Sequence, residues 1–289
     1  MDIKFFIVFS SPAGSTRRVA ETIKKCMSQR NVDAVMLDLG KGDDDSEVID
    51  SIRAAGKQAC LFIGSPVYRD VAVPPIVSFI DRLMTMDKAM AVPFVTWGQA
   101  CSGVALWQMG NALKQKGFSI MGAAKVLAVH SMMWQASTPA GQGHPDKSDL
   151  QKIEKLVQSL LRRFEFADFT PISSGTLDYQ PHVQAEQMKK KIDAPWMIVP
   201  KSVNLEKCSQ CGICEEVCPA AAVDIAPYPQ INQNCFDCFN CIRLCPEDAI
   251  EPALSMNEIQ EYIRKRVRTI NEQPDTQIFC NPNSFTINN

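Results

Sequence analysis

The sequence predicts a doubly wound α/β domain with a parallel sheet, followed by a small cysteine-rich α+β domain. Two observations point to this arrangement. Five apolar runs of strand length alternate with helical segments over the first 165 residues, and one cysteine motif occurs twice after residue 200. Strands of parallel sheets are apolar along their whole length because helices cover both faces of the sheet. A chain of 289 residues is long enough for both domains.

Strands and helices alternate along the first domain. Strands are expected at 3–9, 34–39, 59–64, 91–96 and 118–129, and helices at 15–29, 46–56, 75–85, 103–116 and 148–165. In the first helix, Val19, Ile23 and Met27 recur at helical spacing and so lie on one face. A strand followed by a helix, five times over, predicts a parallel sheet covered on both faces.

The composition changes along the chain and sets the expected boundaries. We expect the first domain at 1–165, a linker at 166–199, the cysteine-rich domain at 200–255, and a C-terminal helix and tail at 256–289. The linker is rich in Pro, Ser, Thr and Gln and ends in an apolar run at 195–200. That run predicts a segment that packs against the domains. The tail contains an amphipathic helix pattern over 256–270.

Charge and hydropathy exclude several classes of protein. A hydrophobic content of 46% and a formal charge of −2 favour neither a nucleic-acid surface nor a membrane surface. Residues 1–165 carry 20 Lys and Arg against 16 Asp and Glu, whereas 166–289 carry 10 against 16. The N-terminus shows no signal-peptide cleavage site and no apolar run approaches membrane-helix length, so we expect a cytoplasmic protein. Twelve cysteines in that compartment predict metal or redox chemistry.

The cysteine motif C-x2-C-x2-C-x3-C-P occurs at 208–219 and again at 235–246, an offset of 27 residues. Three thiolates spaced by two residues wrap one face of an iron–sulfur cubane, and the fourth, one helical turn away, points to the other cluster. Zinc sites and disulfides are weaker explanations, because each run has four cysteines followed by Pro. One [4Fe–4S] cluster is therefore assigned to Cys208, Cys211, Cys214 and Cys245. The other is assigned to Cys218, Cys235, Cys238 and Cys241. Residues 200–255 closely resemble the two-cluster bacterial ferredoxin family.

A loop after the first strand has the composition of a phosphate site. Its residues are Ser11, Pro12, Ala13, Gly14, Ser15 and Thr16. A turn rich in Gly and Ser between a buried strand and a helix presents backbone N–H groups to an anion, and the helix N-terminus adds partial positive charge. A Ser-rich turn of this kind is also a common helix cap.

The segment 7–23 has the spacing of the flavodoxin family, which residues 1–165 resemble. Two further loops follow the third and fourth strands, and parallel α/β sheets bind ligands at the carboxyl ends of their strands. The candidate residues there are Ser65, Pro66, Val67, Tyr68, Thr96, Trp97, Gly98 and Gly103. The resemblance implies strand order 2-1-3-4-5 and bound FMN, with Tyr68 and Trp97 as candidates for stacking on the ring. Pro12, which has no N–H, and Ala13, which has no hydroxyl, depart from the common phosphate loop.

As a whole, the chain resembles flavodoxin–ferredoxin fusion proteins. This resemblance implies an iron–sulfur flavoprotein that transfers electrons between two [4Fe–4S] clusters and FMN. Two alternatives stay open: an FMN-dependent reductase of a small or protein-bound acceptor, and a cluster protein whose first domain is a flavin-free interaction module. The expected partners are redox proteins and, for a reductase, a small acceptor, with neither nucleic acid nor a membrane span. A homodimer is left open, and no catalytic residue is assigned.

Overall fold

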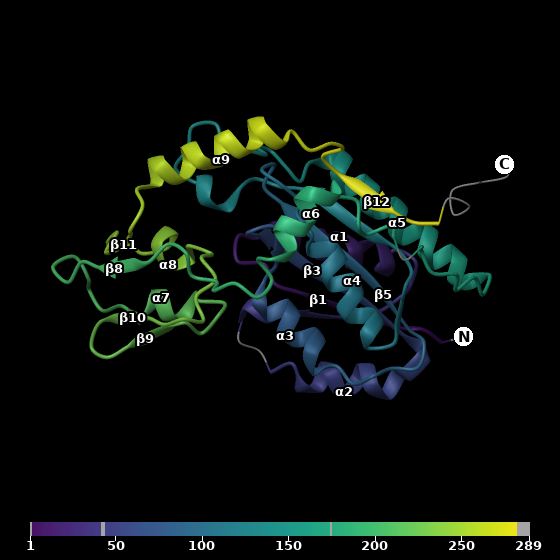
Figure 1. The fold of residues 1–289 in the computed structure, drawn as a ribbon. Helices are drawn as coiled ribbons and strands as arrows, with labels where there is room; N and C mark the ends of the chain where they lie inside the picture. The colour runs from purple at the N-terminus through teal and green to yellow at the C-terminus, as the bar shows by residue number, and fades with distance from the viewer. Residues whose placement is uncertain (1, 42–43, 174, 282–289) are drawn as a thin grey trace.

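The computed structural model describes residues 2–41, 44–173 and 175–281. It consists of a large α/β part and a small part that lies beyond one end of the sheet (Figure 1). The long strands of the sheet are β1 (Lys4–Phe9), β2 (Ala34–Asp38), β3 (Ala59–Tyr68), β5 (Ala89–Trp97) and β7 (Ala123–Leu127). Their order across the sheet is β2-β1-β3-β5-β7, and every neighbouring pair is parallel. This is the flavodoxin-like order predicted from the sequence.

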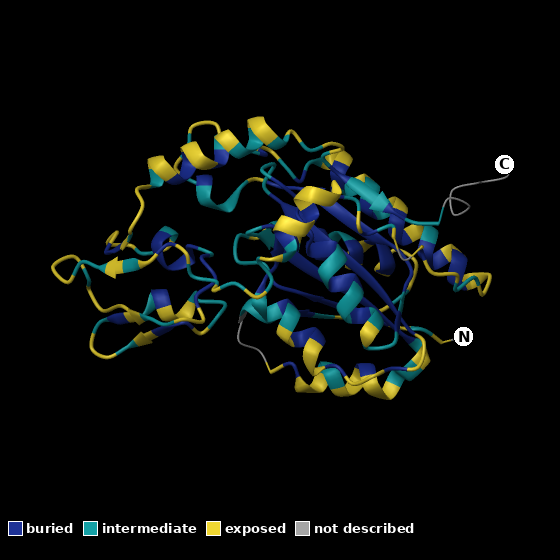
Figure 2. Ribbon diagram, viewed as in Figure 1, coloured by how far each residue is buried: buried dark blue, intermediate teal, exposed yellow. Residues whose placement is uncertain are grey.

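Helices cover both faces of this sheet because the strands are apolar on both sides. Along β1, Phe5, Ile7 and Phe9 point into a core shared with α1 (Ser15–Ser28) and α5 (Lys147–Glu165). The intervening residues face a second core on the other side. That core is covered by α2 (Ser46–Ala55), α3 (Pro74–Arg82) and α4 (Ala105–Gln115). Figure 2 shows the strands buried between these helices.

The small part has two antiparallel pairs of short strands and two single-turn helices. Strand β8 (Lys201–Val203) pairs with β11 (Ile250–Pro252), and β9 (Val223–Ile225) pairs with β10 (Pro229–Ile231). The helices are α7 (Ile213–Glu216) and α8 (Asn240–Arg243), one in each cysteine run. This is a small α+β ferredoxin-type domain, as predicted.

Two strands differ from the prediction. The third extends beyond residue 64 to Tyr68 and turns back through β4 (Val71–Ala72), so residues 65–68 are not a loop. The fifth is broken into β6 (Phe118–Ile120) and β7, both of which pair with β5. The break lets the chain leave β5 and rejoin it farther along.

The linker and tail are integral to the fold. Ile172 and Leu177 of the linker enter the core beneath α4, and its helix α6 (His182–Lys189) buries Ala185 and Met188. The tail begins with α9 (Met256–Ile270), where the amphipathic pattern predicted a helix. It then returns to the large part, where β12 (Gln277–Phe279) pairs antiparallel with β7 and extends the sheet. The sheet is thus built from both ends of the chain.

Helix α5 shows how the local sequence sets an element boundary. Asp146 accepts a hydrogen bond from the backbone N–H of Asp149 at 2.9 Å, and the Asp149 carboxylate accepts one from Asp146 at 2.8 Å. This reciprocal capping box satisfies N–H groups that have no partner inside the helix. His144 lies 2.6 Å from the same Asp149 carboxylate. Within the described residues, no helix combines the length and apolar character needed to cross a bilayer.

Candidate functional site

The two cysteine runs fold into the same backbone shape at the offset of 27 residues. Gln210 and Asp237 have φ of 57° and 55°, and Gly212 and Phe239 have φ of 80° and 64°. The single-turn helices α7 and α8 follow at the same offset. A bulky residue such as Phe239 is rarely found at positive φ, because its Cβ is crowded there. Its backbone therefore follows the turn that the motif requires and not its own preference.

The last cysteine of each run also repeats its hydrogen bond. The sulfur of Cys218 accepts the backbone N–H of Ala222 at 3.2 Å, and that of Cys245 accepts the N–H of Ala249 at 3.3 Å. An N–H donor stabilises a thiolate sulfur and lowers the charge that it presents to a metal. The same backbone donor thus orients the last sulfur in both runs.

The runs exchange their fourth cysteines. One small cavity, the first cage, is lined by Cys208, Cys211, Cys214 and Cys245. Another, the second cage, is lined by Cys218, Cys235, Cys238 and Cys241. Each cage takes three sulfurs from its own run and one from the other, which is the crossed grouping predicted from the sequence. All twelve cysteines lie in the described part of the chain, and none of them forms a disulfide there.

The two cages differ in their exposure. Cys211 of the first cage is exposed, and Cys208 and Cys245 are half-buried. Cys214, the remaining sulfur of the first cage, is buried, and in the second cage Cys235 and Cys241 are buried while Cys218 and Cys238 are half-buried. The first cage therefore has the most exposed sulfur, Cys211, whereas the second is lined mostly by apolar groups, with Lys201 also in its wall.

The predicted phosphate loop lies at the carboxyl end of β1 and leads into α1. Gly14 caps the helix with φ of 89°, a left-handed conformation that glycine adopts without strain. The Ser11 hydroxyl accepts the backbone N–H of Arg17 at 2.9 Å. Thr16 and Thr96 join their hydroxyls at 2.8 Å, which ties this loop to the end of β5. In the first turn of α1, the N–H of Arg17 is taken by Ser11, whereas those of Ser15 and Thr16 have no intrahelical partner and remain suited to an anion.

A cleft at the carboxyl ends of β1, β3, β5 and β7 collects most of the predicted flavin residues. They are Ser11, Pro12, Ala13, Ser15, Thr16, Pro66, Val67, Tyr68, Thr96, Trp97 and Gly98. Its volume is about 40 Å³, whereas small-molecule pockets begin at roughly 300 Å³. Binding of a whole flavin therefore requires the segments around the cleft to separate.

Three of the predicted flavin residues do not line the cleft. Gly14 caps α1 beside it. Ser65 is fully buried, and its hydroxyl donates to Pro66 O at 2.7 Å and accepts the Val73 N–H at 3.0 Å. Gly103 packs so closely on the backbone of Asp70 that a Cβ would lie 2.0 Å from its carbonyl oxygen. Ser65 and Gly103 shape the turns at this end of the sheet.

The two predicted stacking residues have different surroundings. Tyr68 is half-buried, and its hydroxyl is buried without a regular hydrogen-bond partner among the described residues. A buried polar atom of this kind is satisfied either by ordered water or by a ligand that binds in the cleft. Trp97 is 1% exposed, its indole N–H donates to Asp275 O at 2.8 Å, and Lys125 Nζ lies 5.3 Å from its ring. Trp97 is therefore occupied in anchoring the tail, which leaves Tyr68 as the stacking candidate.

His130 also lines the cleft, although the sequence offered no partner to mark it. Its Nδ1 accepts the backbone N–H of Met132 at 3.3 Å. Burial, with a smaller effect from the Arg266 guanidinium, lowers the pKa of His130 to about 4. The ring is neutral at pH 7, and because Nδ1 accepts, the proton sits on Nε2.

The second cage meets the cleft through aromatic side chains. Phe236, between Cys235 and Cys238, is 1% exposed and packs on Tyr68 with the ring centroids 6.0 Å apart. Trp196 of the linker closes on the same phenylalanine, edge to face, at 6.3 Å. Arg243 of the same cysteine run donates to Pro12 O in the phosphate loop at 3.0 Å. The second cage thus lies directly beside the candidate flavin cleft.

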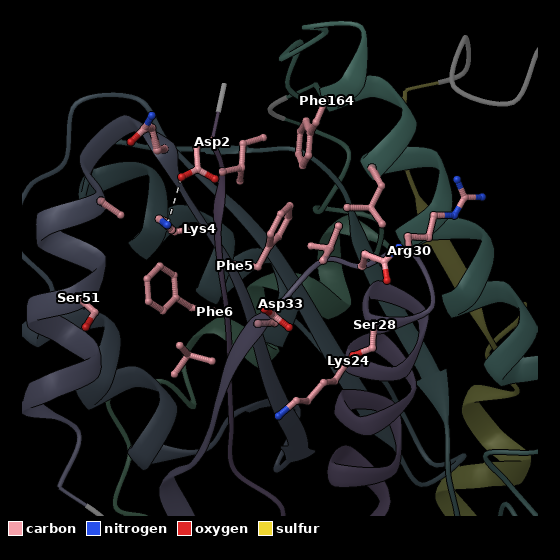
Figure 3. Close-up of a pocket in the computed structure, with 18 of the residues that line it drawn as sticks. Asp2, Lys4, Phe5, Phe6, Lys24, Ser28, Arg30, Asp33, Ser51 and Phe164 are labelled. Carbon is pink, nitrogen blue, oxygen red and sulfur yellow. Dashed lines mark ion pairs between the residues drawn. The ribbon is translucent and has the colours of Figure 1, made fainter.

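Another cavity, of about 1130 Å³, lies at the other end of the sheet (Figure 3). It is lined by the starts of β1 and β2 and by parts of α1, α2 and α5. Its charged groups, such as the Asp2–Lys4 pair at 3.2 Å, are exposed. Open α/β sheets bind ligands at the carboxyl ends of their strands, so this cavity is not assigned a cofactor.

The donor groups at the cages and the cleft fit the cofactors that the sequence implied. Four sulfurs line each cage, as a [4Fe–4S] cluster requires. At the cleft, a helix N-terminus, hydroxyls and an unsatisfied Tyr68 hydroxyl meet, which suits a phosphate joined to a polar aromatic ring.

Residues 201–224 match the family model described as a 4Fe-4S binding domain. A comparison with curated protein sequences finds no match. Among solved structures, the large part is similar to a flavodoxin from the domain Archaea, with 20% identity and a TM-score of 0.44 over 56% of this chain and 99% of that one. It is also similar to flavodoxin 2 from Bacillus cereus, with 18% identity and a TM-score of 0.42 over 56% and 99%.

A third similar structure is the rubredoxin oxygen:oxidoreductase of Desulfovibrio gigas, with 17% identity and a TM-score of 0.46. That match covers 56% of this chain and 36% of the longer protein. The fold assignment rests on the strand order and helix placement of the chain itself. The chain thus joins a domain with the flavodoxin-like strand order to a segment that matches a 4Fe-4S binding domain.

Proposed function

We propose that the protein is a flavodoxin–ferredoxin fusion that carries electrons between two [4Fe–4S] clusters and FMN. The contact between Phe236 and Tyr68 is the observation that carries this proposal, because it joins the second cage to the cleft. When bound, the clusters exchange single electrons at low potential and FMN exchanges one or two. The two cages would hold the clusters, and the loop at 11–16 with Tyr68 would hold FMN.

The side chains at the junction exclude water and fix the two parts. Phe236 and Trp196 cover the space between the second cage and Tyr68 with apolar surface. Asp70, which is 5% exposed, holds the linker through Lys191 and α9 through Arg266, the latter at 2.6 Å. Because that carboxylate is shared by two distant segments, it resists separation of the domains. A fixed junction supports transfer within one chain.

The exposure of the cages suggests the direction of contact with partners. The first cage has the most exposed sulfur, so a redox protein can approach Cys211 closely. The second cage and the cleft are covered by the chain itself. Redox proteins are accordingly the proposed partners.

The proposal is tested by cofactor content after purification without air. Two clusters predict about eight irons and about eight sulfides per chain, and the cleft predicts one FMN after reconstitution. Zinc in place of iron would contradict the cluster assignment. Full iron content with no flavin bound would instead favour the flavin-free interaction module.

A further inference from the structure

Lys201 is a buried lysine in the wall of the second cage. Its side chain is 0% exposed, although lysine is almost never fully buried without a partner. Its Nζ donates to Asp237 Oδ1 at 2.5 Å, to Val199 O at 2.9 Å and to the sulfur of Cys235 at 3.5 Å. It also lies 4.9 Å from the centre of the Phe239 ring. A cation is thus held against a sulfur that faces the cage.

The carboxylate of Asp237 does not cancel this cation at the sulfur. Asp237 also accepts the backbone N–H groups of Ile198 at 2.8 Å and Val199 at 3.1 Å, so part of its charge is offset by these donors. Its nearer oxygen lies 3.9 Å from the Cys235 sulfur, whereas Lys201 Nζ lies at 3.5 Å. The sulfur therefore has the ammonium as its closer charged neighbour.

The first cage has no such cation at the corresponding place. Lys201 pairs with Pro252 across β8 and β11. Ile225 lies 27 positions before Pro252, and it pairs with Pro229 across β9 and β10. Pro229 is therefore the counterpart of Lys201 in the repeat. Pro229 lines the first cage as Lys201 lines the second. Asp237 is likewise replaced by Gln210 in the repeat. The asymmetry is built into otherwise matching backbones.

Lys207 is the lysine next to a cysteine of the first cage, and it is poorly placed to do the same. Its ammonium pairs with Glu251 at 3.5 Å, and its side chain is 50% exposed. Water screens an exposed charge far more than a buried one. Its effect on the first cage is therefore small compared with that of Lys201 on the second.

We propose that Lys201 raises the reduction potential of the cluster in the second cage above that of the cluster in the first. This inference rests on the proposed function. When an electron passes from the cluster in the first cage to the cluster in the second, the second cluster gains one negative charge and the first is oxidised. The ammonium of Lys201 stabilises the added charge. Electrons accepted at the exposed first cage therefore collect in the second cage, beside Tyr68.

The test is a redox titration of the anaerobic full-length protein, followed by electron paramagnetic resonance. Lys201→Met should shift the second cluster's equilibrium toward the oxidised form by at least about tenfold, which corresponds to about 59 mV for one electron. Asp237→Asn, whose amide oxygen can still accept the N–H groups of Ile198 and Val199, should shift it in the opposite direction. Lys201→Arg should stay near wild type, and Lys207→Met should leave the second cluster unchanged.

Opposite shifts are decisive, because a merely structural role would move both variants the same way. Unchanged potentials, or shifts of the same sign, would overturn the inference while the proposed function stands. If Lys201→Met failed to retain iron, Lys201→Gln would take its place, with a fall in the potential of the second cluster supporting the inference and no fall overturning it. A wild-type protein with fewer than two clusters would instead contradict the proposed function itself.

Discussion

Phe236 offers the sharpest perturbation of the junction between the two parts. Its ring is 1% exposed. The centroid of this ring lies 6.0 Å from that of Tyr68 and 6.3 Å from that of Trp196. Replacing a buried Phe with Ala lowers the free energy of unfolding by about 3–5 kcal/mol. Each aromatic pair that is lost accounts for about 0.5–1.5 kcal/mol. Because the ring bridges two parts, we expect Phe236→Ala to lower the free energy of unfolding by about that amount and to loosen the junction.

Two measurements on the anaerobic protein test this prediction, after iron has been counted to show that the cages are filled. Urea unfolding reports the stability, and rapid-mixing spectroscopy reports the rate at which flavin is reduced after the clusters. Phe166→Ala is the matched control, since Phe166 is 75% exposed and its loss should cost less than about 0.5 kcal/mol. A loss under about 1 kcal/mol for Phe236→Ala, or an unchanged flavin rate, would refute the assigned role.

Three more predictions follow from the cages and the cleft. Cys218→Ala should damage the cluster of the second cage, and Cys245→Ala should damage that of the first. Iron content and electron paramagnetic resonance report the damage. If each variant instead lost the cluster held by its own cysteine run, the crossed grouping would be wrong. Gly14→Asp should weaken FMN binding by at least about tenfold, or about 1.4 kcal/mol, in fluorescence titrations, because it adds a negative charge at φ of 89°; Gly14→Ala, whose Cβ meets nothing within 4 Å, separates strain from charge. The lowered pKa of His130, about 4 against an ordinary value of about 6.5, means that unfolding takes up a proton between these pH values. Stability should therefore fall as pH falls through this window, by up to about 1.4 kcal/mol per unit; His130→Asn should flatten that slope in urea unfolding, and an equal slope would contradict the buried neutral ring.

The regular elements could be predicted because their signals are local. The five strands and helices of the large part follow from apolar runs and helical spacing, and 256–270 folds as the helix that its pattern predicted. The grouping of the cysteines follows from the spacing of the repeated motif, whose fourth cysteine binds the cluster of the other run. For the strands, the helices and the three sulfurs that each cage takes from its own run, the residues that fix the structure are close together in the sequence.

What the sequence did not reveal depends on contacts between distant segments. β12 has only three residues, Gln277–Phe279, and is a strand because β7 offers an open edge. The linker helix α6 has little amphipathic pattern and forms against the core. The position of Trp97 was predicted, but its burial under the tail was not, since Asp275 lies far along the chain.

The same holds for the pair of Lys201 and Asp237, which lie in different segments. One local signal could have marked it, because Asp237 stands where the first run has Gln210.

The completion of the sheet by β12 also changes the choice of experiment. Separately expressed halves would leave the edge of β7 unpaired, so a point variant at Phe236 is a cleaner test than cutting the chain.

The central claim is that the second cage and the flavin cleft form one continuous path within a single chain. It is tested most directly by the rate of flavin reduction in anaerobic full-length protein, after rapid reduction of the clusters, over a wide range of protein concentration. The account predicts a rate that does not depend on concentration, because Phe236 joins the second cage to Tyr68 in the same molecule. A rate that rises in proportion to protein concentration would contradict it.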